Sequence, residues 1–389
     1  MTNLNNITIG FDAKRAAQNR TGLGNYSRFI ISGLSQYSNI PRLLLYTPSP
    51  NKTHCLDNLT TLPNIQIRYP KGIWNGPLKN IWRTHAITTD LKNDNVNLYH
   101  GLSNELPLNI RTLKNTRSIV TIHDLIFRQL PNCYHTIDRL IYNYKFQHAC
   151  QNADRIIAVS QCTKRDIINH YNINPDKITV IYQGCDDQFW TTPSPDDKAQ
   201  LRNALGPWLP QHYILYVGTI EQRKNLLLLA KALLHLPKDI TIIAAGKRTK
   251  YADQIDKFLR DNNLSGRLKI ISGLKFSLLP ALYTLADTFV YPSRYEGFGI
   301  PILEALVSRT PVIACTGSCL EEAGGPSSIY VNPDDDQALA QAITQTLSDN
   351  QLRQKMITDG LAHAQQFRHD TLTHNLLALY NDVLNNPNT

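Results

Sequence analysis

This 389-residue sequence lacks long apolar runs and paired cysteines. No stretch approaches the roughly 20 apolar residues of a membrane-spanning helix, and residues 1–6 have neither the basic start nor the apolar run of a secretory signal. The seven cysteines are scattered, odd in number and without a C-x-x-C pair, which argues against a disulfide framework and against a zinc or dithiol motif. We therefore expect a soluble cytoplasmic protein with free, mostly buried thiols.

Nucleic-acid-binding motifs are also lacking, although the net charge is +9. There is no RNP-like motif, zinc-finger spacing or dense basic run, so we expect no nucleic-acid partner. The excess charge lies entirely in residues 1–190, which hold 21 Lys and Arg against 12 Asp and Glu, whereas residues 191–389 hold 19 of each. A basic first half fits an anionic acceptor or peripheral contact with the inner face of the plasma membrane. Plain solubility, with no such partner, explains the charge equally well.

The length and the alternation of strand-like and helix-like segments predict two α/β domains. Short β-branched or apolar runs alternate with longer helical segments, a pattern typical of βα units on a parallel sheet. The expected strands form two series, one on either side of a Pro- and Gly-containing segment at residues 191–210: 7–11, 43–46, 65–69, 98–100, 118–122, 155–159 and 178–182, then 213–217, 240–245, 268–271, 288–291, 312–314 and 329–331. We therefore expect two Rossmann-like doubly wound domains with a boundary near residue 190.

The most informative segment is residues 291–304 (YPSRYEGFGIPILE). It leaves a strand, turns on Gly297 and Gly299 around Phe298, and enters a helix near Pro301. Glycines let a backbone approach a ligand closely, and the free N–H groups at a helix start favour an anion. One turn into the helix, Glu304 is placed to accept hydrogen bonds near such a ligand. The segment therefore predicts a phosphate and sugar site.

Glu296 and Glu304, with seven residues between them, resemble the paired glutamates of the retaining glycosyltransferases of family 4, which have the GT-B fold. The resemblance covers essentially the whole chain. It implies a nucleotide diphosphate sugar held in a cleft between the two domains, with Glu296 beside the donor sugar and Glu304 on the ribose hydroxyls. It also implies that a final helix, residues 371–389, packs back on the N-terminal domain (1–190), leaving 191–370 as the donor-binding domain. Two carboxylates that merely favour a helix start remain the alternative.

Two cations stand at the turn that opens the second series, in residues 216–225 (YVGTIEQRKN). Arg223 and Lys224 follow Gly218 and are suited to a diphosphate, because Arg forks onto two oxygens and Lys acts as a point charge. The turn resembles the family's diphosphate-binding turn, which implies that role. Many members carry a further Arg after the glycine, where this chain has Thr219. An ordinary solvated helix start is the alternative.

Three residues of the first domain complete the candidate set. Gly22 and Gly24 lie in a segment that resembles the family's loop beneath the donor phosphates, although the pair alone is a weak signal and loop flexibility also explains it. His123 follows the carboxyl end of a strand, where ligands of open α/β sheets bind, and resembles the family histidine that faces the donor sugar. A neutral imidazole there would bond a sugar hydroxyl or a backbone carbonyl.

The sequence shows no metal cluster, since its one Asp-x-Asp match, residues 334–336, reads as a helix start. We therefore expect a retaining, metal-independent hexosyltransferase of cell-surface polysaccharide assembly that needs no cofactor besides the sugar nucleotide. A GDP-linked mannose is favoured as donor, a UDP sugar stays open, and the acceptor is a saccharide or a lipid-linked saccharide. A nucleotide-sugar epimerase and a non-catalytic nucleotide- or glycan-binding module are the alternatives.

Two tryptophans in the first domain, Trp74 and Trp82, stand among Lys71, Lys79 and Arg83. Such a group fits an interfacial patch. Packing of a helix against the following strand explains the tryptophans as well, and is the favoured alternative.

Overall fold

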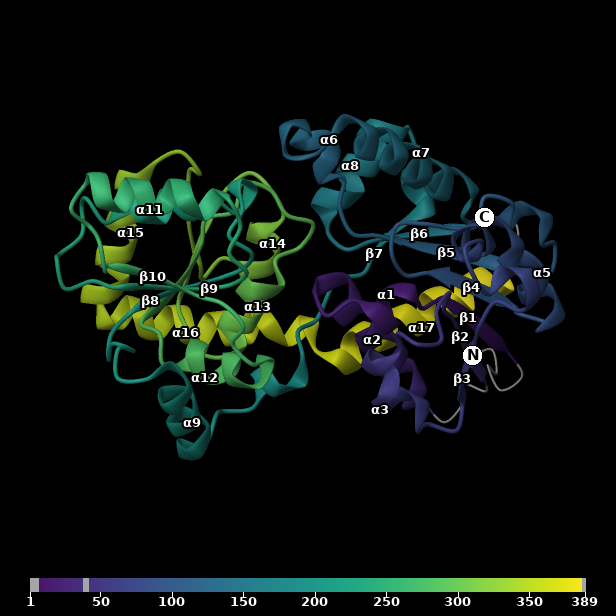
Figure 1. Cartoon of the computed structure of the whole chain (residues 1–389), viewed down its shortest axis with the longest axis horizontal. Coiled ribbons are helices and arrows are strands. Elements are labelled where there is room, and N and C mark those ends of the chain that lie inside the picture. The colour runs from purple at the N-terminus through teal and green to yellow at the C-terminus, as the bar shows by residue number, and fades with distance from the viewer. Residues whose placement is uncertain (1–6, 38–41, 387–389) are drawn as a thin grey trace. The chain divides into compact units, whose positions relative to one another are not determined.

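The computed structural model describes residues 7–37 and 42–386 of the chain. The chain divides into two compact units, each built on one parallel sheet (Figure 1). Unit 1 takes Met1–Gly184 and Phe367–Thr389, and unit 2 takes Cys185–Gln366. The predicted pair of doubly wound domains is confirmed, and each of the thirteen expected strands overlaps an observed one.

The sheet of unit 1 has seven strands in the order β3-β2-β1-β4-β5-β6-β7. The order reverses between β1 and β4, and the register there pairs Ile9 with Leu98. At such a reversal the loops after the two strands diverge and leave room for a ligand. The strands are β1 (Thr8–Asp12), β2 (Arg42–Tyr46), β3 (Ile65–Arg68), β4 (Leu98–Gly101), β5 (Arg117–Ile122), β6 (Arg155–Ala158) and β7 (Ile178–Val180).

Helices cover both faces of this sheet. They are α1 (Lys14–Gln18), α2 (Gly22–Ser35), α3 (Asp57–Thr60), α4 (Lys79–Ile81), α5 (Ile87–Asn93), α6 (Ile126–Gln129), α7 (Thr136–Asn152), α8 (Gln161–Tyr171) and α17 (His369–Asn385). A π-helical turn spans Trp82–Ala86, and 3-10 turns span His54–Leu56, Gly72–Trp74, Ile110–Thr112, Pro131–Cys133 and Pro175–Lys177. Trp82 is buried and donates to Asp90 at 2.7 Å, so the packing interpretation is correct for it.

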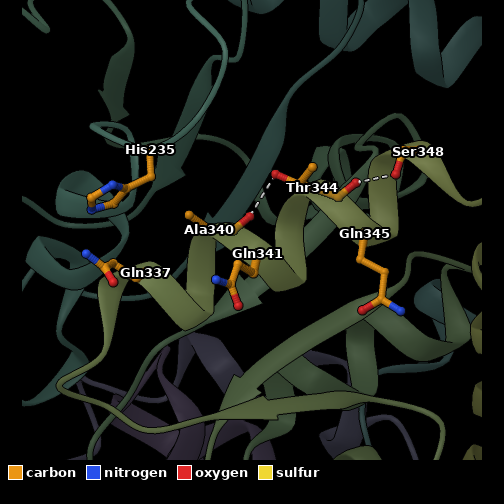
Figure 2. Close-up of a pocket in the computed structure, with 7 residues that line it drawn as sticks. All are labelled: His235, Gln337, Ala340, Gln341, Thr344, Gln345 and Ser348. Carbon is orange, nitrogen blue, oxygen red and sulfur yellow. Dashed lines mark hydrogen bonds between the residues drawn. The ribbon is translucent and has the colours of Figure 1, made fainter.

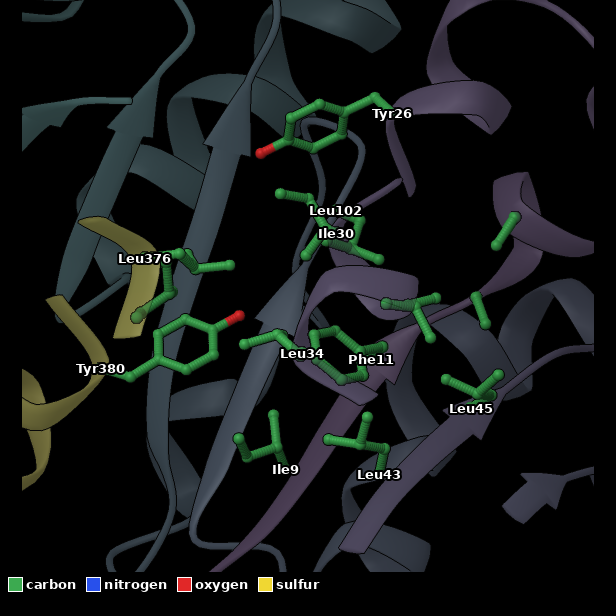
Figure 3. Close-up of a cluster of buried hydrophobic side chains, with 14 of the residues drawn as sticks. Ile9, Phe11, Tyr26, Ile30, Leu34, Leu43, Leu45, Leu102, Leu376 and Tyr380 are labelled. Atoms are coloured by element: carbon green, nitrogen blue, oxygen red, sulfur yellow. The ribbon is translucent and has the colours of Figure 1, made fainter. Parts of the chain in front are cut away.

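The final helix, α17, completes the core on one face of the unit 1 sheet. Its apolar side chains Leu376 and Tyr380 pack with Leu34 of α2 and with Ile9 and Phe11 of β1 (Figure 3). The hydroxyl of Tyr380 lies 2.6 Å from Nδ1 of His100, at the end of β4. The helical spacing of the tail therefore does give a buried face, as expected.

The sheet of unit 2 has six strands in the order β10-β9-β8-β11-β12-β13, with the reversal between β8 and β11. Two helical layers flank it, α10, α11 and α15 in one and α12, α13 and α16 in the other (Figure 1). The strands are β8 (Ile214–Val217), β9 (Ile242–Ala245), β10 (Leu268–Ile271), β11 (Thr288–Tyr291), β12 (Val312–Cys315) and β13 (Ile329–Val331).

The helices of unit 2 are α9 (Pro195–Leu205), α10 (Leu226–Ala232), α11 (Tyr251–Asp261), α12 (Leu279–Thr284), α13 (Ile300–Val307), α14 (Leu320–Gly324), α15 (Asp336–Ser348) and α16 (Asn350–Ala364). The 3-10 turns are Asp187–Trp190, Gln222–Lys224, Phe276–Leu278 and Gln365–Phe367. Asp335 caps α15 by accepting a bond from the backbone N of Ala338, so residues 334–336 do form a helix start.

The limits of the units lie a few residues before those expected at 190 and 371. The chain passes to unit 2 at Cys185 because the turn that follows belongs to that core, where the ring of Phe189 meets the rings of Phe276 and Tyr283 edge-on. It returns at Phe367, whose ring packs edge-on against Tyr182 of unit 1.

Candidate active site

Three neighbouring strands of unit 2 deliver loops to one edge of its sheet. Strands β8, β11 and β12 are adjacent and parallel, so their carboxyl ends share an edge. The loop after β8 carries Gly218, Arg223 and Lys224, and the loop after β11 carries Glu296. The reversal of strand order falls between β8 and β11, the position at which open α/β sheets bind ligands.

Glu296 is the centre to which these loops converge. Lys224 donates to Oε1 of Glu296 at 3.0 Å, and Arg223 approaches the same oxygen at 2.7 Å. Tyr291 and Ser293 donate to it as well, at 2.9 Å and 2.8 Å. The structure thus brings together three of the predicted site residues, with two cations on one carboxylate.

The electrostatics of this cluster keep Glu296 ionised. Burial by itself would raise the pKa of the carboxyl group, but Lys224 and then Arg223 hold the pKa well below its usual range. Arg223 also pairs with Glu221 at 2.9 Å, so two carboxylates balance the two cations in the absence of a ligand. An anionic ligand that binds these cations therefore replaces a carboxylate partner.

Further hydrogen bonds join the loops that follow β8 and β11. Arg223 donates to the carbonyl oxygen of Tyr295 at 2.7 Å, and the backbone N of Arg294 donates to the carbonyl of Arg223 at 2.9 Å. From the β12 loop, Sγ of Cys319 lies 3.1 Å and 2.8 Å from the carbonyl oxygens of Glu296 and Phe298. The side chains of the cluster are therefore fixed by three loops rather than carried on one flexible segment.

The second glutamate, Glu304, is buried in α13 at 8% exposure. The hydroxyl of Tyr283 donates to its Oε2 at 2.8 Å. The helix begins after Gly299, whose φ of 124° is rarely adopted by other residues, and a Cβ there would lie 3.3 Å from Ala323. Gly297 and the buried Phe298 precede this turn, and Gly218 lies against the Lys224 side chain.

Burial sets the protonation of Glu304. It raises the pKa of the carboxyl group from 4.5 to about 8, while the Tyr283 bond opposes the rise and Asp186 adds to it. The folded protein thus holds this proton more tightly than the unfolded chain. Its contribution to the free energy of unfolding is complete below pH 4.5 and is lost as the pH rises to about 8.

We expect Glu304→Gln to remove this part of the pH dependence, because the amide does not titrate. The free energy of unfolding of the wild type relative to Glu304→Gln should fall by about 4 kcal/mol between pH 4.5 and 8, at 1.36 kcal/mol for each pKa unit. Urea titrations of both proteins between pH 5 and 9 measure most of this difference. Groups such as His100 and His123 cancel because both proteins contain them. Parallel pH profiles would contradict the assignment.

His123 lies at the corresponding edge of unit 1, after β5. It is buried, and Nε2 donates to the carbonyl oxygen of Leu102 at 2.8 Å while Nδ1 accepts from Gln183 at 2.9 Å. Burial lowers the pKa of the imidazole to about 4, and the Leu102 bond only partly opposes this. His123 is thus neutral at pH 7, with both ring nitrogens engaged. The sequence suggested a sugar hydroxyl or a backbone carbonyl as the partner of His123, and the structure contains the backbone carbonyl, that of Leu102.

The two glycines at the start of α2 differ in their surroundings. A Cβ on Gly24 would lie 1.8 Å from the carbonyl oxygen of Asn19, whereas a Cβ on Gly22 would meet nothing within 4 Å. The backbone therefore requires glycine only at residue 24. The open space at Gly22 is available to a ligand.

We expect Gly24→Ala to destabilise the protein by about 2 kcal/mol or more, because the added carbon forces backbone atoms apart. Gly22→Ala is the matched control and should raise stability by up to about 1 kcal/mol, since alanine favours the helix. Urea unfolding of the two variants measures both effects. Equal stability of the two would show that the contact with Asn19 is easily relieved.

Sequence reasoning missed the partners of the predicted residues. Tyr291 and Ser293 belong to the segment already singled out, and their hydroxyls, five and three residues before Glu296, were the available signal. Gly246 follows β9 as Gly218 follows β8, and a Cβ on it would lie 1.8 Å from the carbonyl oxygen of Gly218. No local signal marked Tyr283, which reaches Glu304 from another helix.

A surface hollow lies elsewhere in unit 2, along α15 (Figure 2). Most of the residues that line it have polar side chains, among them His235, Gln337, Gln341 and Gln345. None of the predicted site residues lines it. Among residues 7–37 and 42–386, no group of three or more His, Cys, Asp and Glu side chains is arranged to hold a metal ion.

Comparison with protein families identifies both units. Residues 197–362 match the model described as "Glycosyl transferases group 1", and residues 42–189 match "Glycosyltransferase Family 4". The chain belongs to the family 4 glycosyltransferases. The glycosyltransferase is 28% identical over 379 residues to "O-antigen chain mannosyltransferase B" of Escherichia coli, covering 92% of this chain and 96% of the relative. It is 26% identical to "O-antigen chain mannosyltransferase RfbU" of Salmonella typhimurium, covering 85% and 88%.

Solved structures confirm the GT-B fold of the glycosyltransferase. Sucrose-phosphate synthase from Thermosynechococcus elongatus matches with a TM-score of 0.78 at 20% identity, covering 97% of this chain and 99% of that one. Anabaena Alr3699/HepE, solved in complex with UDP-glucose, matches with a TM-score of 0.75 at 19% identity, covering 96% and 99%. In the part of the glycosyltransferase that the structure describes, no helix is long and apolar enough to cross a membrane.

Proposed function

We propose that this glycosyltransferase is a retaining hexosyltransferase that takes its sugar from a nucleotide diphosphate donor bound to unit 2. The observation that carries the proposal is the convergence of Arg223 and Lys224 on Glu296 at the reversal of the unit 2 sheet. Such a site offers a diphosphate two cations and an adjacent helix start, with a carboxylate beside them.

The donor is held by charge at one end and by hydrogen bonds at the other. Its diphosphate replaces Glu296 as the partner of the Arg223 and Lys224 side chains. The ribose hydroxyls donate to Glu304, whose bond from Tyr283 fixes the orientation of the carboxyl group. Gly22 leaves room for the donor phosphates or the acceptor in unit 1.

The transfer keeps the configuration at the anomeric carbon. The bond between that carbon and the departing diphosphate oxygen breaks while the acceptor oxygen bonds on the same face, and the acceptor proton passes to the diphosphate. Arg223 and Lys224 stabilise the charge that develops on the leaving group, so no metal ion is required. Neutral His123 binds a sugar hydroxyl, which replaces Gln183 as the hydrogen-bond donor to Nδ1.

Mannose carried by GDP is the favoured donor, because two relatives that match 92% and 85% of this chain are named as mannosyltransferases. A UDP sugar is the other candidate, since a protein of the same fold was solved with UDP-glucose. The names of the relatives also favour a saccharide or lipid-linked saccharide acceptor in O-antigen or related polysaccharide assembly.

A thermal-shift screen of nucleoside diphosphates and their sugars tests the donor. The preferred nucleotide should raise Tm most, since at 100 times its Kd it adds about 2.7 kcal/mol of stability. Incubation of that sugar nucleotide with and without saccharide acceptors then separates transfer from the alternatives. An isomerised donor formed without acceptor would indicate an epimerase, and tight binding without turnover a binding module. NMR of the product tests retention, which an inverted anomeric centre would exclude.

A further inference from the structure

Four polar side chains form a chain of hydrogen bonds through the core of unit 1. The hydroxyl of Tyr380 in α17 lies 2.6 Å from Nδ1 of His100 in β4. Nε2 of His100 lies 2.8 Å from Oγ1 of Thr121 in β5, and the same oxygen lies 3.1 Å from the hydroxyl of Tyr26 in α2. The chain from Tyr380 to Tyr26 therefore joins four elements that are far apart in the sequence.

Burial makes this chain of hydrogen bonds rigid. The side chains of Tyr380, His100, Thr121 and Tyr26 are all buried, and Figure 3 shows the two tyrosine rings among the aliphatic side chains of the core. Burial lowers the pKa of His100 to about 3, so its imidazole is neutral at pH 7 and has one donor and one acceptor nitrogen. A buried polar group that loses its partner is costly, so the bonds hold each of these side chains in place.

The end of the chain at Tyr26 meets His123. The ring centroids of Tyr26 and His123 lie 4.6 Å apart, and the two ring planes are perpendicular. The energy of such an edge-to-face contact depends on the angle between the rings as well as on their distance. Tyr26 therefore restrains the plane of the imidazole, in addition to the hydrogen bonds that His123 makes with Leu102 and Gln183.

This restraint becomes more important in the donor complex. A sugar hydroxyl that binds Nδ1 of His123 takes the place of Gln183, which leaves the bond from Nε2 to Leu102. A single hydrogen bond fixes one point of a ring but not the plane of the ring. The edge-on contact with Tyr26 supplies the missing restraint, because a tilt of the imidazole would break that contact.

We propose that Tyr26 is a positioning residue for His123, and that the chain of hydrogen bonds to Tyr380 keeps the Tyr26 ring in place. The proposal rests on the function proposed for His123, the binding of a hydroxyl of the donor sugar. Tyr26 is itself buried and its hydroxyl is bonded to Thr121, so it acts through His123 rather than on the substrate. Binding groups held in this way keep their geometry when the ligand arrives.

Calorimetric titration of the full chain with GDP and GDP-mannose, and with UDP and UDP-glucose, tests this proposal. For each base, the Kd of the nucleoside diphosphate divided by the Kd of its sugar measures what the sugar adds to binding. Tyr26→Leu should lower this ratio by about threefold to tenfold, the loss expected for one hydrogen bond between neutral groups. Tyr26→Phe keeps the ring and should recover most of the ratio. The Kd of the nucleoside diphosphate itself should not change, since its proposed contacts are in unit 2.

The double variant His123→Ala/Tyr26→Leu separates the positioning role from the function proposed for His123. If Tyr26 acts through His123, the double variant should have the same ratio as His123→Ala alone. A wild-type ratio in His123→Ala would contradict the proposed function of His123. A lowered ratio in His123→Ala, combined with no effect of Tyr26→Leu or with an effect that adds fully to it, would overturn the positioning role alone.

A second measurement needs no nucleotide. In protein labelled with ¹⁵N-histidine, the proton on Nε2 of His123 should exchange slowly with water, because it is donated to Leu102 in a buried site. Tyr26→Leu should speed this exchange at least about tenfold, because the edge-on contact is lost. Unchanged exchange in Tyr26→Leu would overturn the proposal whatever the titrations show.

Tyr46→Phe is the matched control for Tyr26→Phe. Tyr46 is also a buried tyrosine of unit 1, and its hydroxyl donates to Asp94 at 2.7 Å. Its loss should lower stability in urea but leave the Kd ratio and the exchange of the His123 proton at their wild-type values. An equal change of both in Tyr46→Phe would show that any loosening of the core has this effect, and would also overturn the proposal.

Discussion

Replacing Lys224 with alanine should lower the turnover number by about 10² to 10³, the loss typical of removing one group that stabilises charge in a transition state. Negative charge develops on the diphosphate as its bond to the sugar breaks, so the lysine stabilises the transition state more than the bound donor. The KM for the donor should therefore change much less. Single-turnover measurements with saturating donor give the chemical step directly.

The same substitution should leave the fold intact. Arg223, Tyr291 and Ser293 still donate to Glu296 in Lys224→Ala, so the carboxylate keeps three of its four partners. Lys231→Ala removes an exposed lysine from the same unit and should retain wild-type turnover. Wild-type turnover in Lys224→Ala would remove the proposed role of the β8 loop.

Replacing Glu304 with alanine should raise the Kd of the preferred nucleoside diphosphate by about tenfold to a hundredfold, as expected for a lost hydrogen bond to a charged group. Hydrogen bonds donated by the ribose hydroxyls favour the ionised form of Glu304. Without nucleotide, the pKa of Glu304 is about 8, so the group is mostly protonated at pH 7. Binding near pH 7 should therefore release a proton. Calorimetry in two buffers of different ionisation enthalpy measures both the affinity and the proton release.

Glu304→Gln provides the comparison, because it keeps the side-chain volume and one acceptor oxygen. It should recover part of the affinity but release no proton. Unchanged nucleotide affinity in Glu304→Ala would show that the ribose binds elsewhere, even if the Lys224 prediction holds.

The strands could be predicted from the sequence because buried parallel strands form short continuous apolar runs. Residues 242–245 and 312–315, for example, are buried throughout their length. The segment around Glu296 was also predictable, since its glycines and carboxylates stand close together in the chain. Arg223, Lys224 and Glu296 come together because the loops after adjacent parallel strands share an edge.

Two features could not be predicted because they depend on contacts distant in sequence. The bonds of His123 to Leu102 and Gln183 join three loops, and no local pattern gives the state of its ring nitrogens. Ile137, Leu140 and Tyr144 of α7 are spaced as an apolar helical face, yet all three side chains are exposed in the structure. Spacing does not tell whether such a face is turned towards the sheet or away from it. That choice is made by the charge network of Glu105 and by the packing of Phe146.

The packing of α17 on unit 1 has a consequence for synthesis of the chain. Unit 2 is continuous in sequence, so all its strands are available once residue 366 has left the ribosome. Unit 1 has by then exposed the apolar face that Leu376 and Tyr380 later cover, and His100 still lacks its bond to Tyr380. The domain that emerges first is therefore the last to be completed, and its nascent form carries an apolar surface of the kind that chaperones protect.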